Sequence, residues 1–131
     1  MIELEPLCTA TFTFSQQFVV SSTLGIAEFA SARFDGERLS GSMKGVAADW
    51  LRLTPDGYGI QDVKLTIETD DLAIIHIAYT GRFLLDSGTA YVAPSFHTGD
   101  ERYAWLNRAF VIAKGAMTDA TTLTYEMFEV G

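Results

Sequence analysis

The chain has 131 residues, of which 48% are apolar and 20% are charged. This length and balance predict one folded domain and exclude an intrinsically disordered chain. Nine Lys and Arg stand against seventeen Asp and Glu, and the resulting net charge of −8 repels phosphate groups. No basic cluster compensates for this charge, so we expect neither nucleic acid nor a membrane as a partner.

Cys8 is the single cysteine of the chain. An internal disulfide and a site of several thiolates are therefore excluded. Cys8 alternates with polar residues in step with Ala10 and Phe12, so we expect a small core residue and not a nucleophile. We find no secretory signal pattern and no apolar run near the ~20 residues that span a bilayer, and we expect a cytoplasmic protein.

Alternation of apolar and polar residues, the signature of half-buried strands, dominates the sequence. In chain order, the expected strands cover residues 4–14, 18–20 with 25–34, 49–53, 58–69, 72–82, 83–94, 106–113 and 122–130. Turn residues separate them at Asp35-Gly36, Thr54-Pro55-Asp56-Gly57 and Asp70-Asp71. Residues 114–116 are predicted to be part of the loop that connects the last two strands. One short helix is expected around residues 100–107, with Asp100 as its N-terminal cap.

These elements predict an all-β fold. About eight to ten short strands at regular spacing are typical of a barrel or sandwich, and closure removes exposed strand edges. We therefore expect a single domain over residues 1–131, a closed or nearly closed antiparallel β-barrel with one short helix.

Common site signatures are missing from the sequence. There is no Gly-rich phosphate loop, no dinucleotide fingerprint, no nucleophile elbow and no zinc-binding helix. His76 and His97 are the only histidines, and their spacing does not indicate a metal site. We expect no metal and no cofactor.

A stripe of polar residues runs along the expected strand 58–69 and comprises Asp62, Lys64, Thr66 and Glu68. These side chains share one face of the strand. If that face meets solvent, the stripe is an ion-pair ladder that contributes about 0–1 kcal/mol. If it lines a cavity, the charges must be paired and their pKa values can diverge, as acid–base catalysis requires.

The turn that follows decides which residues share the side of this stripe. A two-residue turn at Asp70-Asp71 pairs Asp62 with Tyr79 and places His76 on the opposite, apolar face as a packed histidine. The stripe would then lie beside Ile75, Ile77 and Tyr79, a mixed surface typical of a ligand pocket. A three-residue turn would invert these pairings.

The two tryptophans are the other candidate ligand-binding residues. Trp50, beside Asp49, and Trp105, downstream of His97, each offer a flat ring and one N–H donor for a ring-shaped ligand. Core filling is the alternative for each of them.

Several segments, in order along almost the whole chain, resemble the small-barrel family labelled domain of unknown function 3237. They are Ala47-Ala48-Asp49-Trp50, Thr54-Pro55-Asp56-Gly57, residues 62–71, Tyr79-Thr80-Gly81-Arg82 and residues 98–107. The resemblance implies a compact β-barrel with an internal cavity, assembled as a homo-oligomer, but no settled activity. Here Ala47 stands where the family more often has Gly, and Lys64 where Arg is common, which alters how a carboxylate would be held.

Three functions follow from these observations. The first is a cofactor-independent lyase, isomerase or cyclase that acts on a small hydrophobic or aromatic molecule. Its acid–base group would be Asp49, Asp62 or Glu68, and Tyr79 and Lys64 would stabilise negative charge. Trp50, Trp105, His97 and Arg82 would bind the ligand.

The second function is a ligand carrier or sensor without chemistry, and the third is an assembly subunit. We favour the first, because charges enclosed in an apolar cavity are costly unless they are used.

Overall fold

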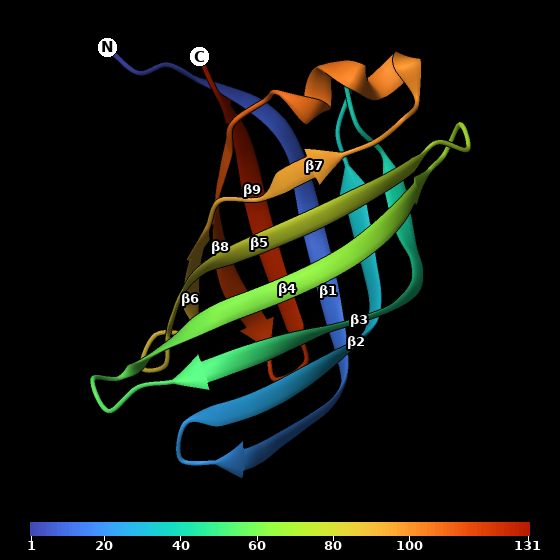
Figure 1. The fold of residues 1–131 in the computed structure, drawn as a ribbon. Helices are drawn as coiled ribbons and strands as arrows, with labels where there is room; N and C mark the ends of the chain where they lie inside the picture. Colours follow the sequence, from blue (N-terminus) through green and yellow to red (C-terminus); the bar gives the residue numbers. More distant parts are fainter.

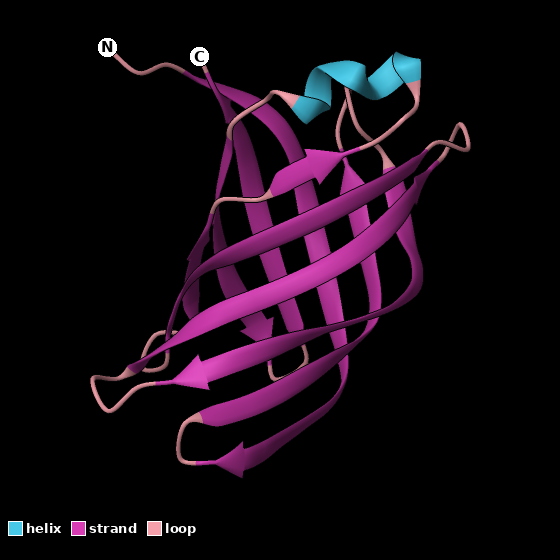
Figure 2. Ribbon diagram, in the orientation of Figure 1, coloured by secondary structure: helices cyan, strands magenta, loops and turns pink.

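A computed structural model describes residues 1–131 as nine β-strands and one short 3₁₀ helix. The strands are β1 (Leu4–Ser21), β2 (Leu24–Asp35), β3 (Gly41–Leu53), β4 (Tyr58–Thr69), β5 (Ile74–Leu84), β6 (Thr89–Val92), β7 (Ser95–His97), β8 (Val111–Asp119) and β9 (Thr122–Val130). The helix, η1, covers Glu101–Asn107 between β7 and β8. Figure 2 shows how far strands outweigh helix in the fold.

Eight of these strands close into an antiparallel barrel. The ring runs β1, β2, β3, β4, β5, β6, β8 and β9, and it closes where β9 pairs with β1. The short β7 pairs with β5 beside β6 (Figure 1). The predicted all-β barrel with one short helix is therefore confirmed.

The barrel interior is filled by the apolar faces of the strands, with Phe12 of β1 near the centre. Its ring centroid lies 5.1 Å from that of Phe29, 5.6 Å from Tyr125 and 5.8 Å from Phe34. All three pairs are tilted or edge-to-face, the geometry that aromatic rings prefer in cores. Cys8 is buried, as predicted, and burial raises the pKa of its thiol to about 12, so the thiol stays protonated.

Helix η1 lies across one end of the barrel, near both chain termini (Figure 1). Asp100 caps it as predicted, because its carboxylate accepts a hydrogen bond from the Arg102 backbone N–H at 2.9 Å. Leu106 of η1 is fully buried in the core. No helix of the structure is long and apolar enough to cross a membrane.

The turn between β4 and β5 has three residues, Asp70 to Leu72, and not the two predicted. Its ends are tied by a 2.8 Å hydrogen bond from the Thr69 N–H to the Ala73 carbonyl, and Leu72 takes a left-handed φ of 73°. Asp62 therefore pairs with Thr80, and Tyr79 pairs with Val63. The predicted register was wrong by one residue, which moves every side chain of one strand to the other face.

Several predicted strand boundaries were also wrong: residues 18–20 extend β1, and the predicted strand 83–94 is divided between β5 and β6. Glycine explains two further differences. β3 begins at Gly41 and not at residue 49. The prediction missed residues 41–48 because Gly45 takes a φ of 78° and the strand loses its pairing with its neighbours there, so the sequence is like that of a loop. Residues 114–116 belong to β8 and do not form a loop. Gly115 pairs with Tyr125, and the missing Cβ leaves room for the tyrosine ring.

Replacement of Gly115 by alanine tests this packing. The new Cβ would lie 2.6 Å from Tyr125 Cδ1, so the buried ring must move. We expect Gly115→Ala to lower the free energy of unfolding by about 1–3 kcal/mol, measured by chemical denaturation. Gly99→Ala is the matched control, because nothing lies within 4 Å of its Cβ position. Equal stability of the two variants would contradict the packing role of Gly115.

Candidate functional site

A cavity of about 90 Å³ lies in the mouth of the barrel at the end opposite η1, where the exposed Gln17 contributes to its lining. Its position follows from its lining, which comes from the strand ends on that side. The lining residues are Phe14, Gln17, Ala27, Phe29, Asp49, Leu51, Gln61, Tyr79, Phe83, Met117 and Leu123. The cavity is therefore mostly apolar, with a few polar groups.

Asp49 is the only charged residue among the buried side chains, with 7% of its surface exposed. Strand alternation turns Asp49 inward, while its neighbour Trp50 points outward. Burial raises the pKa of Asp49 to about 6. A 3.0 Å hydrogen bond from the Asp62 backbone N–H to Asp49 Oδ1 partly opposes this shift, and the negative charge of Asp62 adds to it. Asp49 therefore exchanges its proton near neutral pH, as a general acid or base must.

Three other polar side chains lie beside Asp49 in the interior. Gln61 is 2% exposed, and its Nε2 donates a hydrogen bond to the Tyr125 hydroxyl at 3.0 Å. Its Oε1 has no protein partner. The Tyr79 ring packs edge-on against Tyr125, with centroids 6.0 Å apart. Burial raises the pKa of both tyrosines, and the Asp49 charge raises them further, so both remain hydroxyl donors.

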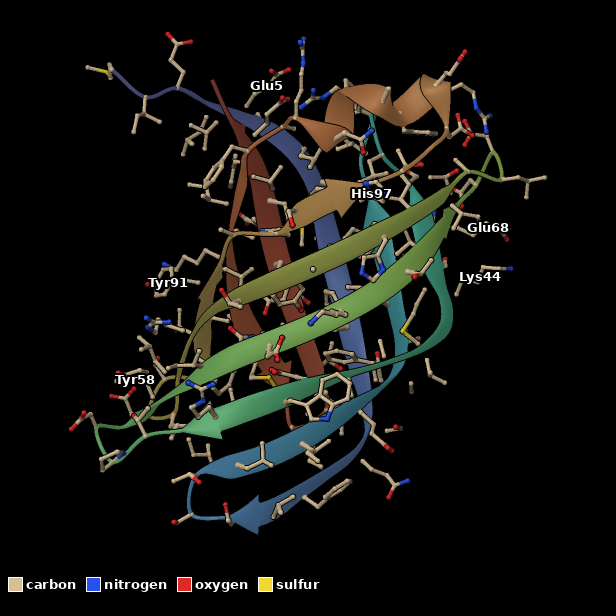
Figure 3. The ribbon with its side chains drawn as sticks, viewed as in Figure 1. Glu5, Lys44, Tyr58, Glu68, Tyr91 and His97 are labelled. Carbon is tan, nitrogen blue, oxygen red and sulfur yellow. The ribbon has the colours of Figure 1, made fainter.

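The predicted charged stripe lies on the outside of the barrel. Asp62 pairs with Lys64 at 3.6 Å and Glu68 with Lys44 at 3.7 Å, and the side chains of both acids are substantially exposed. Figure 3 shows Glu68 and Lys44 projecting away from the barrel. The expectation that Asp62, Lys64 and Glu68 line a cavity was wrong. The three-residue turn brings the apolar faces of β4 and β5 to the same side, that side is buried, and the charged face of β4 is left outside.

Trp50 and Lys64 instead lie together on the outer wall, in an open groove of about 590 Å³. The groove follows the break in β3 between Lys44 and Ala48. Because pairing is lost there, the inward-facing Phe29 contributes to the groove as well as to the internal cavity. The Phe29 ring thus separates the two hollows.

The remaining predicted residues lie away from the cavity. Arg82 is exposed on β5, with its guanidinium 5.8 Å from the Tyr58 ring. Trp105 belongs to η1, where the Arg38 guanidinium stacks 4.8 Å from its ring. His97 is exposed on β7 (Figure 3) and pairs across the sheet with His76. His76 is thus exposed on the outer face, and its prediction as a packed core histidine was wrong.

Of the predicted residues, the structure brings only Asp49 and Tyr79 together in the interior. Sequence analysis missed Gln61 and Tyr125. Both carried a usable signal, because each is a polar residue on the apolar face of an alternating strand. Gln61 shares a face of β4 with Val63 and Leu65, and Tyr125 shares a face of β9 with Leu123.

The sequence matches the family described as Protein of unknown function (DUF3237) over residues 2–130. The chain belongs to this family. No protein of curated function matches the sequence.

Solved structures share the fold at low sequence identity. A conserved protein of unknown function from Rhodopseudomonas palustris is 21% identical, with a TM-score of 0.89 over 100% of this chain and 99% of that one. A β-barrel-like protein from Acinetobacter baumannii AYE is 20% identical, with a TM-score of 0.86 over 100% and 97%. A protein described as an enzyme from Penicillium herquei is 23% identical, with a TM-score of 0.76 over 99% and 95%.

The raised pKa of Asp49 predicts a pH-dependent stability difference between the wild type and Asp49→Asn. A carboxyl group with a folded pKa of about 6 and an ordinary value of 3.8 binds its proton more tightly in the folded state. Its contribution is therefore fully present below pH 3.8 and lost as pH rises to about 6. We expect Asp49→Asn to match the wild type near pH 4 and to exceed it by about 1–3 kcal/mol above pH 6.

Denaturant unfolding of both proteins across this pH range measures the difference. Glu68→Gln, which removes a carboxylate from the outer face of β4, is the control and gives no such pH-dependent gain. A constant difference between Asp49→Asn and the wild type at every pH would contradict the raised pKa.

Proposed function

We propose that this protein binds a small hydrophobic or aromatic molecule and acts on it as a cofactor-independent acid–base enzyme, a lyase, isomerase or cyclase. The observation that carries the proposal is Asp49, a buried carboxyl group with a pKa of about 6 beside an apolar cavity. A buried carboxylate without a cationic partner is destabilising, so its presence in the interior favours a chemical use. The fungal relative described as an enzyme supports catalysis on this fold.

The groups around Asp49 are suited to proton transfer. Asp49 gives or takes the proton at the reacting atom, and Tyr79, whose hydroxyl stays protonated, donates to an oxygen that gains negative charge. The unpartnered Gln61 Oε1 accepts from a hydroxyl of the ligand and orients it. Of the three acid–base candidates from the sequence, Asp49, Asp62 and Glu68, this proposal keeps Asp49 alone, and it no longer assigns a role to Lys64.

The size of the cavity favours an enzyme over a carrier. Ligand pockets commonly enclose about 300–1,000 Å³, because a carrier must cover most of its cargo. The internal cavity holds about 90 Å³, enough for a reactive substituent but not for a whole metabolite. The buried groups therefore serve one part of the substrate, while the rest lies outside the cavity.

The outer groove offers a place for that remaining part. Phe29 lines both hollows, so in this proposal its ring must move for one molecule to occupy the groove and the cavity together. Trp50 then supplies a half-exposed ring against which an aromatic portion stacks, in keeping with its predicted ligand-binding role. Trp50 and Asp49 are consecutive, so the two faces of β3 would hold the two parts of one molecule.

Comparative metabolite profiling tests the proposal. The wild type and Asp49→Asn are incubated with a small-molecule extract of the source organism, and mass spectrometry follows the compounds that change. We expect the wild type to convert one compound to an isomer or to fragments, and Asp49→Asn to do so about 100–10,000 times more slowly. Native mass spectrometry should show that Asp49→Asn still binds the compound, whereas Trp50→Ala should weaken binding.

Glu68→Gln provides the control for loss of an external carboxylate and retains wild-type turnover. The pH profile then assigns the role of Asp49. A rate that rises through about pH 6 identifies a base, and one that falls identifies an acid. Binding of a compound that every protein returns unchanged would contradict catalysis and establish a carrier.

A further inference from the structure

An open groove of about 540 Å³ lies on the outer wall of the barrel, over β5, β6, β8 and β9 and beside the start of β1. Its lining residues are Leu4, Thr80, Gly81, Tyr91, Val92, Ala93, Ile112, Ala113, Lys114 and Phe128. The groove shares no lining residue with the internal cavity or with the groove at Trp50. It is therefore separate from the site of the proposed function.

The pairing of the strands explains this hollow. Tyr91 of β6 pairs with Lys114 of β8, and Ile112 of β8 pairs with Phe128 of β9. β6 ends beside these residues, and the next position along the chain holds the small side chain of Ala93. The hollow is thus bounded by longer side chains around a short one.

The lining is apolar and open to solvent. Leu4, Tyr91 and Ile112 have 50%, 46% and 36% of their surfaces exposed. Exposed apolar side chains that gather around one hollow mark a binding site. The volume of the groove lies within the range of about 300–1,000 Å³ that is common for ligand pockets. The groove therefore has the space and the surface for a small molecule with an apolar body.

Lys114 is the one charged residue of the lining. Its Nζ lies 5.8 Å from the centroid of the Tyr91 ring, and it forms no ion pair, although Glu126 stands opposite on β9. Five of the nine Lys and Arg residues do form ion pairs with carboxylates, namely Arg33, Arg38, Lys44, Lys64 and Arg102. The Lys114 ammonium thus remains available to a carboxylate from outside the protein.

Arg82 is a second cation without a carboxylate partner near the groove. It pairs with Tyr91 from the β5 side, as Lys114 does from the β8 side. Its guanidinium lies 5.8 Å from the Tyr58 ring. Across β5, β6 and β8, the outer face therefore carries a cation, a tyrosine and a cation, in a chain with a net charge of −8. This local positive charge favours an anionic group at the groove.

We propose that the groove binds a small monocarboxylate with an apolar body, such as a medium-chain fatty acid. The carboxylate pairs with the Lys114 ammonium, and the body packs along Tyr91, Ile112 and Phe128. The lining offers few side chains that could replace hydrogen bonds to water, so polar substituents on the body would weaken binding.

A free carboxylate fits the charge pattern better than a larger partner. An anionic membrane would face the whole acidic barrel, whereas a small ligand meets the cations of the groove at close range and the remaining charges through screening solvent. A second copy of the chain would bring its own net charge of −8.

Titration of the full chain with decanoate, followed by NMR of the backbone amides, tests the proposal. We expect the amides of Thr80, Tyr91 and Lys114 to shift in a saturable way, while the amides of Asp49 and Gln61 in the internal cavity do not. Octanoate has two methylene groups fewer, so it should bind about five to ten times more weakly.

Three variants identify the groups that bind decanoate. Lys114→Gln should raise the dissociation constant about fivefold, the upper end for an exposed ion pair, and Lys114→Arg should keep the wild-type value. Ala93→Phe should raise it about tenfold, because the ring takes the space of the alkyl chain. Both positions are exposed, so these variants should keep the thermal midpoint of the wild type.

Lys44→Gln is the matched control for loss of an exposed lysine. Lys44 pairs with Glu68 and projects from a part of the barrel wall far from Tyr91 (Figure 3). This variant should bind decanoate like the wild type. Equal affinities of Lys114→Gln and Lys44→Gln overturn the proposal, and so does unchanged binding by Ala93→Phe.

Two further outcomes also overturn the proposal and assign the groove to another occupant. Binding to vesicles that contain phosphatidylglycerol, without binding to decanoate, indicates a membrane surface. An affinity for decanoate that falls as the protein concentration rises indicates that a second copy covers the groove. Asp49→Asn should bind decanoate like the wild type, so failure of this proposal and failure of the proposed function are distinguishable.

Discussion

The three-residue turn between β4 and β5 sets which residues of these two strands lie on the same side of the barrel wall. Thr69 holds it, because its hydroxyl contacts Asp71 at 2.6 Å and accepts the Ala73 N–H at 2.7 Å. The flanking aspartates anchor it further. Asp70 receives two 2.8 Å hydrogen bonds from Arg33, and Asp71 receives the Tyr103 hydroxyl of η1 at 2.8 Å. Every inward-facing residue of β4 and β5 depends on this register.

The internal cavity is one consequence of that register. With β4 and β5 in phase, Gln61 and Tyr79 face inward from adjacent strands and meet Asp49 from β3. The surrounding apolar packing raises the pKa of Asp49 and keeps the tyrosines protonated. The same burial that raises this pKa makes the Asp49 carboxylate unfavourable for stability at neutral pH, a cost that the proposed acid–base role would explain.

Irregularities in the strands account for the openings in an otherwise closed wall. The break in β3 near Gly45 lets the buried Phe29 line the outer groove, and the extra length of β1 produces the projecting hairpin. At the other end, η1 closes the barrel with Leu106. The segment 98–107, specific in the family resemblance, therefore has a structural role here: Asp100 caps the helix, and Asn107 bonds the Thr98 backbone on both sides.

The sequence by itself determined the fold class, most of the strands, the short helix with its Asp100 cap and the burial of Cys8, because alternation, turn residues and caps act locally. It also indicated Asp49 and Tyr79 as candidate site residues, and the structure places both in the interior. Tertiary structure alone decided which face of each strand lines the interior. One added turn residue, Leu72, reverses that choice, and its left-handed φ has no signal in a leucine side chain. The continuation of β8 through Gly115 likewise depended on Tyr125, a residue of the neighbouring strand. The alternation within one strand does not tell which aspartate is buried. Contacts between strands decide that Asp49 is buried and Asp62 is exposed.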